Sequence, residues 1–170
     1  SPSPELVEHI ERTVMSYPGV LGVHDLMVHD YGPGHQFASL HVEFPAETDP
    51  LTAHDVIDNI ENDFLKKDRL QVTIHYDPIV TADASVGVLR ARLKEHARQL
   101  DPRLSIHDLR IVPGDSHTNV LFDLVFPAGY TGDIDQMLAK MCQFVKEQDP
   151  KYCCVVKVEQ SYASALPDKK

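Results

Sequence analysis

The sequence predicts an α+β fold in which one helix–strand–strand–helix–strand unit occurs twice in tandem. The first observation is an internal repeat, because the segment Gly22–Val28 (GVHDLMV) aligns with Ser105–Ile111 (SIHDLRI). A second pair of matching segments ends at Pro45 in one copy and at Pro127 in the other. The third observation is that the same order of helical and alternating apolar patterns follows in each copy.

The first copy begins with a helix and two strands. Ser3 is expected as the N-cap of the helix, whose apolar stripe stops near Pro18. Apolar alternation predicts strands at about 22–29 and 36–44, and the Gly-Pro-Gly sequence at 32–34 predicts the turn between them.

The first copy closes with a second helix and a third strand. Asp49 and Pro50 predict the start of the helix, and apolar residues at helical spacing predict its buried face. The third strand is expected from Gln71 to Asp77, with Pro78 ending it because proline cannot donate to a sheet ladder.

The second copy repeats this order. Asp83 is expected to cap its first helix. Strands are expected near 105–112 and 118–126, followed by a helix near 132–147 and a last strand at about 153–160. Two helices on a three-stranded sheet form a two-layer sandwich, so each unit is expected to have a ferredoxin-like αββαβ fold. The predicted domains are 1–80 and 81–163, followed by a tail at 164–170.

The composition excludes some classes of function. The formal net charge of −10 argues against nucleic-acid binding, which needs a positive surface to meet phosphates. No apolar run approaches the ~20 residues that cross a bilayer, so we expect a soluble chain. Because it begins at Ser1 without a methionine, we also expect it to be a piece of a longer protein.

Histidines are concentrated in the first copy, where seven of the ten lie between His9 and His75. Strand alternation places His75 and Asp77 on one face of the third strand, and leaves His41 and Glu43 on the polar face of the second. His41 therefore meets His75 if the two strands are neighbours. Imidazole with carboxylate suits zinc, and also nickel, cobalt, copper or ferrous iron.

Two further histidines are candidates with weaker local support. His54 is followed at i+4 by Asp58, which can accept a ring N–H and orient a ligating imidazole. Strict alternation groups His24 with the core residues Leu26 and Val28, so His24 must lie at the strand entrance or at a bulge to join a site.

These residues together resemble a known family. Five motifs of the first copy are similar to the C-terminal cytoplasmic domain of cation diffusion facilitator (cation efflux, zinc transporter) proteins. They are His24-Asp25-Leu26, the Gly-Pro turn, Leu40–Glu43, His54 with Asp58, and Ile74–Pro78. The resemblance covers about residues 4–78. It implies a metallochaperone-like αββαβ domain that forms a homodimer on the cytoplasmic side of the membrane, beneath the transmembrane domain of the same full-length protein.

The resemblance also implies which residues bind a metal ion and which ions they bind. The metal ligands carried over are His24, His41, His54, His75 and Asp77, for Zn²⁺ or another divalent ion such as Co, Ni, Cd, Fe or Mn. The family often holds two metals with a bridging carboxylate, and His54 is then expected to act across the dimer interface.

The second copy departs from the family pattern. His107 matches His24, but Asp123, Lys157 and Glu159 replace His41, His75 and Asp77. We therefore expect the second copy to be a degenerate repeat without the site.

The function expected from these residues is not enzymatic. We expect a regulatory and dimerisation domain of a divalent-cation efflux transporter, which senses cytoplasmic metal and closes the dimer on binding. One alternative is a small-molecule-sensing ferredoxin-like module in which the histidines are incidental. Another is a binuclear metallohydrolase, in which a bridged pair of metals activates water.

Overall fold

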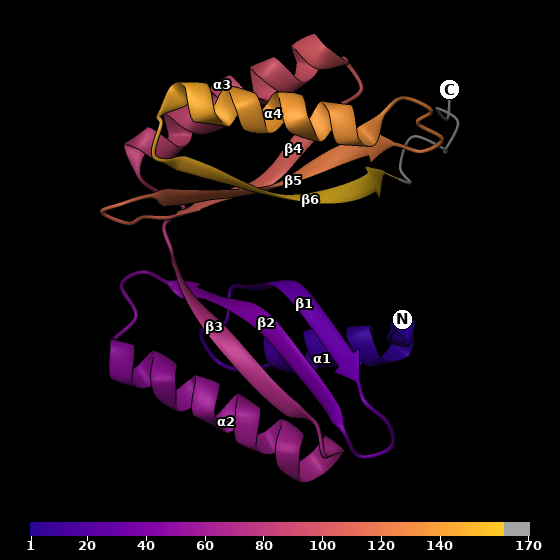
Figure 1. The fold of residues 1–170 in the computed structure, drawn as a ribbon. Helices are drawn as coiled ribbons and strands as arrows, with labels where there is room; N and C mark the ends of the chain where they lie inside the picture. The colour runs from indigo at the N-terminus through magenta and orange to yellow at the C-terminus, as the bar shows by residue number, and fades with distance from the viewer. Residues whose placement is uncertain (162–170) are drawn as a thin grey trace, which may run out of the picture. The chain divides into compact units, whose positions relative to one another are not determined.

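The computed structural model describes residues 1–161, which fall into two compact units: unit 1, residues 1–79, and unit 2, from Val80 onward. Each unit has two helices and one three-stranded sheet in the order helix, strand, strand, helix, strand (Figure 1). This order confirms the predicted α+β fold of two tandem ferredoxin-like units. The predicted tail, 164–170, and the last two residues of the predicted second domain lie outside the described residues.

Unit 1 has β2 at the centre of its sheet, antiparallel to β1 and parallel to β3. A parallel pair needs a crossover, and α2 supplies it between β2 and β3. Ser3 and Asp49 cap the two helices as predicted, since each side chain accepts a backbone N–H of the first turn. The elements are α1 (Pro4–Met15), β1 (Gly22–Asp30), β2 (Gln36–Pro45), α2 (Pro50–Asp68) and β3 (Gln71–Ile79).

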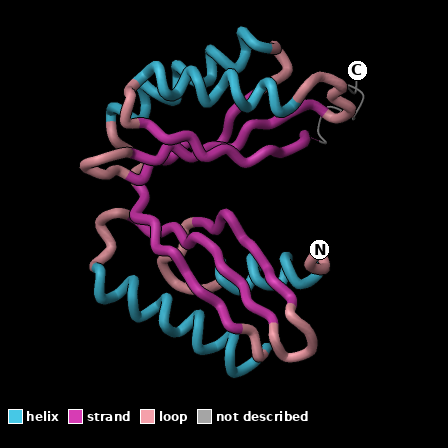
Figure 2. The backbone as a smooth tube through the Cα atoms, in the orientation of Figure 1, coloured by secondary structure: helices cyan, strands magenta, loops and turns pink. Residues whose placement is uncertain are grey.

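Unit 2 repeats the topology of unit 1, with β5 between an antiparallel β4 and a parallel β6 (Figure 2). Asp83 caps the first helix of this unit, as the sequence predicts. The elements are α3 (Ala84–Leu100), β4 (Ser105–Val112), β5 (Thr118–Pro127), α4 (Ile134–Gln148) and β6 (Tyr152–Ser161).

Both helices of a unit pack on the same face of its sheet. In unit 1, Ile10 of α1 and Phe64 of α2 are fully buried in one cluster with Leu40 and Val42 of β2. Because successive strand residues point to opposite faces, His41 and Glu43 lie on the other face. We call this face, which the helices of unit 1 do not cover, the open face.

None of the helices in residues 1–161 is long and apolar enough to span a membrane.

The first strand of each unit contains a bulge at the same place in the repeat. The pairing of β1 with β2 shifts between His24 and Met27, and the pairing of β4 with β5 shifts between His107 and Arg110. The aspartate at each bulge has a left-handed backbone, with φ of 51° at Asp25 and 56° at Asp108. Aspartate tolerates this region better than most residues.

The prediction that Pro78 ends the third strand is wrong. Strand β3 continues through Pro78, which pairs with Phe44, and ends at Ile79. The reason is topological: β3 is an edge strand, and proline is tolerated there when its missing N–H is on the side away from the neighbouring strand.

Helix α2 ends at a strained residue, which gives a test of the fold. Arg69 caps the helix with φ of 52° and donates its N–H to the carbonyl of Phe64. Glycine adopts this conformation without the Cβ penalty, so we expect Arg69→Gly to stabilise unit 1 by about 0.5–1 kcal/mol. Urea unfolding followed through NMR resonances of unit 1 measures the effect. Arg69→Ala keeps the strained geometry, and equal stability of the two variants contradicts the prediction.

Candidate metal centre

A row of polar side chains crosses the open face of unit 1 from one edge strand to the other. His24 of β1 pairs with His41 of β2, and His41 pairs with His75 of β3. Two residues further along these strands, Glu43 of β2 pairs with Asp77 of β3, and both side chains lie on the same face. The strand register therefore brings together four of the five predicted ligands, from all three strands.

The bulge in β1 is what brings His24 to this face. Strict alternation would place His24 on the same side as Val28, but the bulge between them inserts an extra residue into β1. As a result, His24 shares the open face with His41, whereas Val28 lies opposite the core residue Ala38. The condition set by the sequence, that His24 must lie at a bulge or a strand entrance, is met.

Asp77 is the centre of the cluster. Its Oδ2 atom lies 3.1 Å from His24 Nε2 and 3.0 Å from His41 Nδ1, and its Oδ1 atom lies 3.4 Å from His75 Nε2. The Asp77 side chain is buried, while exposure increases outward from 9% for His24 to 33% for His41 and 66% for His75. The cluster therefore opens to solvent on the side of His75.

Glu43 is a member of the cluster that sequence reasoning did not assign. Its buried carboxylate lies 3.1 Å from His24 Nδ1, so it orients the ring with Nε2 towards Asp77. Gly22 provides the space, because a Cβ atom there would lie 2.8 Å from Glu43 Oε2. Alternation places Glu43 on the polar face, but its burial and its contact with His24 depend on the bulge.

Two buried carboxylates around one imidazole hold a proton on that imidazole. Burial lowers the pKa of His24, but hydrogen bonds to Asp77 and Glu43 and the charges of these groups outweigh it and raise the pKa to about 9. Burial raises the pKa of Asp77, yet hydrogen bonds from His24 and His41 hold it below its ordinary value. At neutral pH, His24 is therefore protonated beside Asp77 and Glu43.

The distances from the Asp77 oxygens to the three ring nitrogens are close to the spacing between ligands of a tetrahedral ion. Ligands at about 2.0–2.1 Å from a tetrahedral zinc lie about 3.3–3.4 Å from one another. The distances from Asp77 oxygens to ring nitrogens are 3.0–3.4 Å, and the rings of His41 and His75 stack with centroids 4.4 Å apart. His41, His75 and Asp77 form one group of close donor atoms, and His24, Asp25 and His41 form another.

His54 is the predicted ligand that unit 1 does not bring to the cluster. It lies in the first turns of α2, on the helical layer of the unit, and its side chain is 73% exposed. The expected partner is in reach, since His54 Nδ1 is 3.8 Å from Asp58 Oδ2. Asp25, by contrast, was not predicted as a ligand and is brought close to His24 and His41 by the bulge.

The equivalent face of unit 2 holds basic side chains. His107 pairs with Asp123, and Asp123 pairs with Lys157, as the histidines do in unit 1. Arg110 lies 3.9 Å from Asp123, and Lys157 lies 3.7 Å from Glu159. Burial, and then the charge of Glu159, raise the pKa of Asp123 to about 6 despite these cations. Among the described residues of unit 2, no group of three close His, Cys or acidic donors occurs.

Comparison with known proteins bears on unit 1. The family model described as the cytoplasmic domain of cation efflux proteins matches residues 2–79, which is nearly the whole of unit 1. A search among curated proteins found no match to the chain.

The buried imidazolium predicts a pH dependence of the metal-free protein. Because the pKa of folded His24 is about 9, above its ordinary 6.5, its stabilising contribution is complete below pH 6.5 and is lost as the pH rises through 9. The expected loss is about 3 kcal/mol of the unfolding free energy of unit 1. Urea unfolding with chelator, at pH 6.5 and above 9, measures it. The prediction fails if the loss is absent, or if His24→Asn shows the same loss.

Proposed function

Because unit 1 belongs to the family of cation efflux protein cytoplasmic domains, we propose that it is a metal-sensing dimerisation domain on the cytoplasmic side of a membrane. The divalent ion we propose is zinc, with Co, Ni, Cd, Fe and Mn as ions that the same donor types accept. The observation that supports the proposal best is the convergence of His24, His41 and His75 on the buried carboxylate of Asp77.

The charges of the cluster favour a cation. Glu43 and Asp77 are buried carboxylates, and in the metal-free protein a single imidazolium at His24 lies between them. Zinc bound here would supply the positive charge in place of the proton on His24. Nε2 of His24 would then be free to hold the ion, while Glu43 accepts the remaining Nδ1–H and keeps the ring in place.

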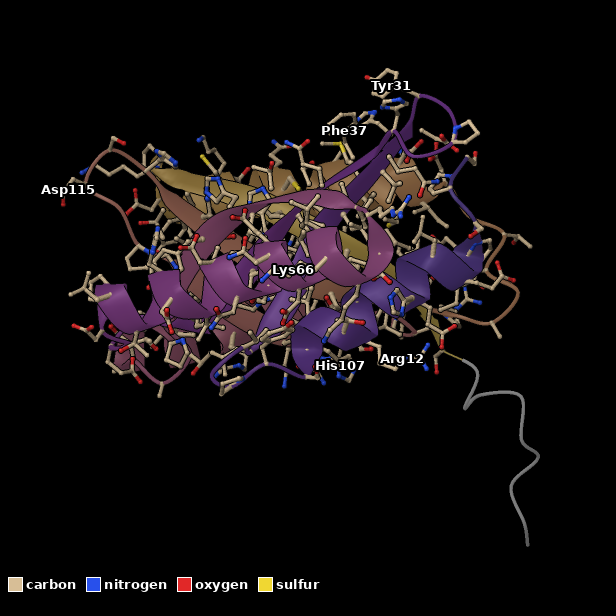
Figure 3. The ribbon with its side chains drawn as sticks, turned by 90° about the horizontal axis from the view of Figure 1, so that it is seen from below. Arg12, Tyr31, Phe37, Lys66, His107 and Asp115 are labelled. Carbon is tan, nitrogen blue, oxygen red and sulfur yellow. The ribbon has the colours of Figure 1, made fainter. Side chains whose placement is uncertain are left out.

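The exposed side of the cluster suits a partner. His75 is the most exposed member of the cluster, and the open face also carries exposed apolar side chains towards the β1–β2 turn. Phe37 packs edge-on against Tyr31, with ring centroids 5.8 Å apart (Figure 3). We propose that a second copy of unit 1 covers this face in a homodimer. We propose that His54, exposed in the first turns of α2, completes the partner's ligand set from the rim of this interface.

Charge provides the regulation in this proposal. Each chain carries a formal charge of −10, so two copies repel each other when no metal is bound. A metal ion shifts the equilibrium between the separated and the closed arrangement of the dimer only as far as it binds the closed arrangement more tightly. Ligands contributed by both copies create that difference in affinity. Closing the dimer then acts on the transmembrane domain of the same full-length transporter.

The ligand set is tested by zinc titration. We expect the chain to bind zinc saturably in isothermal titration calorimetry, and His75→Ala to weaken binding by about tenfold or more, since even outer-shell partners are worth 10–100-fold. His75 is mostly exposed, so its removal spares the fold. His29→Ala removes an exposed histidine of β1 from outside the cluster and serves as the matched control. Absence of saturable binding in the wild type refutes the site.

Dimer closure is tested separately by small-angle X-ray scattering. We expect zinc to reduce the radius of gyration of the wild-type dimer, because bound metal neutralises and cross-links the two copies. Asp77→Ala removes the central ligand and is expected to abolish the change. An unchanged scattering profile with saturating zinc contradicts metal-driven closure, even if the titration shows that zinc binds.

A further inference from the structure

Unit 2 contains a pocket that the proposed metal site does not involve. It has a volume of about 150 Å³ and lies between α3 and the bulge of β4. Its lining consists of two basic residues of α3 and four consecutive residues of β4: Arg90, Lys94, Ile106, His107, Asp108 and Leu109.

The helix beside the pocket is basic in an acidic chain. Helix α3 carries four arginine or lysine residues and one acidic residue, Glu95. Each of the other three described helices has at least as many acidic as basic residues. Two of the basic residues of α3 already have partners, because Arg92 donates to Gln148 Oε1 and Arg98 pairs with Glu95. The remaining two, Arg90 and Lys94, line the pocket.

The two pocket cations have no acidic partner among the described residues. Arg90 Nη2 lies 3.4 Å from the carbonyl oxygens of Thr81 and Leu109, so neutral backbone groups hold the guanidinium against the bulge. Lys94 follows one helical turn later on the same side of α3 and is exposed. These groups therefore present donors and positive charge that no carboxylate neutralises through an ion pair.

The bulge supplies the opposite wall of the pocket. The register of β4 skips Asp108, whose left-handed backbone interrupts the ladder between His107 and Arg110. His107 also lines the pocket, but its side chain lies with Asp123 on the sheet face away from α3. Asp108 is the only acid in the lining, which keeps a net positive charge from Arg90 and Lys94.

We propose that this pocket binds a phosphate group. Phosphate accepts hydrogen bonds from guanidinium and ammonium donors, which Arg90 and Lys94 supply here. The pocket is small and confined to six residues, which fits one phosphate group and not a strand of nucleic acid. The source is either free phosphate or a small phosphate ester.

NMR titration of the metal-free 170-residue chain tests the proposal. Inorganic phosphate is added at constant ionic strength with chelator present, so the result does not depend on the zinc site. We expect saturable shifts of the amides of residues 106–109, and an affinity about tenfold lower in Lys94→Gln, through the loss of a charged hydrogen bond. Lys94 is exposed and its replacement spares the fold. A parallel titration with adenosine monophosphate identifies the source, since tighter binding than phosphate indicates an ester.

Arg92→Gln is the matched control, because it removes the same charge from the same helix outside the pocket. We expect it to weaken binding by less than about twofold, since salt screens distant charges. Equal weakening by Arg92→Gln and Lys94→Gln would show diffuse attraction to α3 and overturn the proposal. Shifts that do not saturate in the wild type would overturn it as well.

Discussion

The imidazole of His24 lies between two buried carboxylates, and the open face of unit 1 depends on this contact. His24 comes from β1, Glu43 from β2 and Asp77 from β3, so one side chain joins all three strands. Two buried carboxylates without a cation would be costly, because burial disfavours their charged forms. In the metal-free protein, the proton on His24 offsets this desolvation cost. The same negative charges are what make the site attractive to a dication.

The bulge in the first strand is the backbone feature that makes this contact possible. It turns His24 from the core side to the open face and brings Asp25 beside the cluster. Its repetition at Asp108 in unit 2 shows that the bulge belongs to the repeated scaffold and does not require the metal ligands. In unit 1 it positions the candidate ligand His24, whereas in unit 2 it forms one wall of a pocket.

The two units therefore differ in what offsets the charge of the carboxylates on this face. In unit 1, the proton on His24 offsets the charges of the carboxylates. Unit 2 places Arg110 near Asp123 and Lys157 near Glu159, so cations of the chain itself occupy the equivalent face. Lys157 stands where unit 1 has His75, so a nitrogen lone pair is exchanged for a fixed positive charge. The duplication thus preserves the scaffold while the chemistry of the open face differs.

The repeat, the order of the elements and the face on which three candidate ligands lie follow from local sequence patterns. Apolar periodicity and capping residues are local, so Ser3, Asp49 and Asp83 mark helix starts without reference to the rest of the chain. Strand alternation is equally local, and it places His41, His75 and Asp77 on one face. The family match over residues 2–79 agrees with the resemblance that these motifs carry.

The remaining features depend on tertiary structure, because burial and register involve residues far apart in the sequence. The position of His24 required the bulge, and the role of Glu43 required the space above Gly22. The continuation of β3 through Pro78 followed from its place at a sheet edge, which no local rule encodes. A side chain's face can be read from its own strand, but its partners are set by the strands that pack beside it.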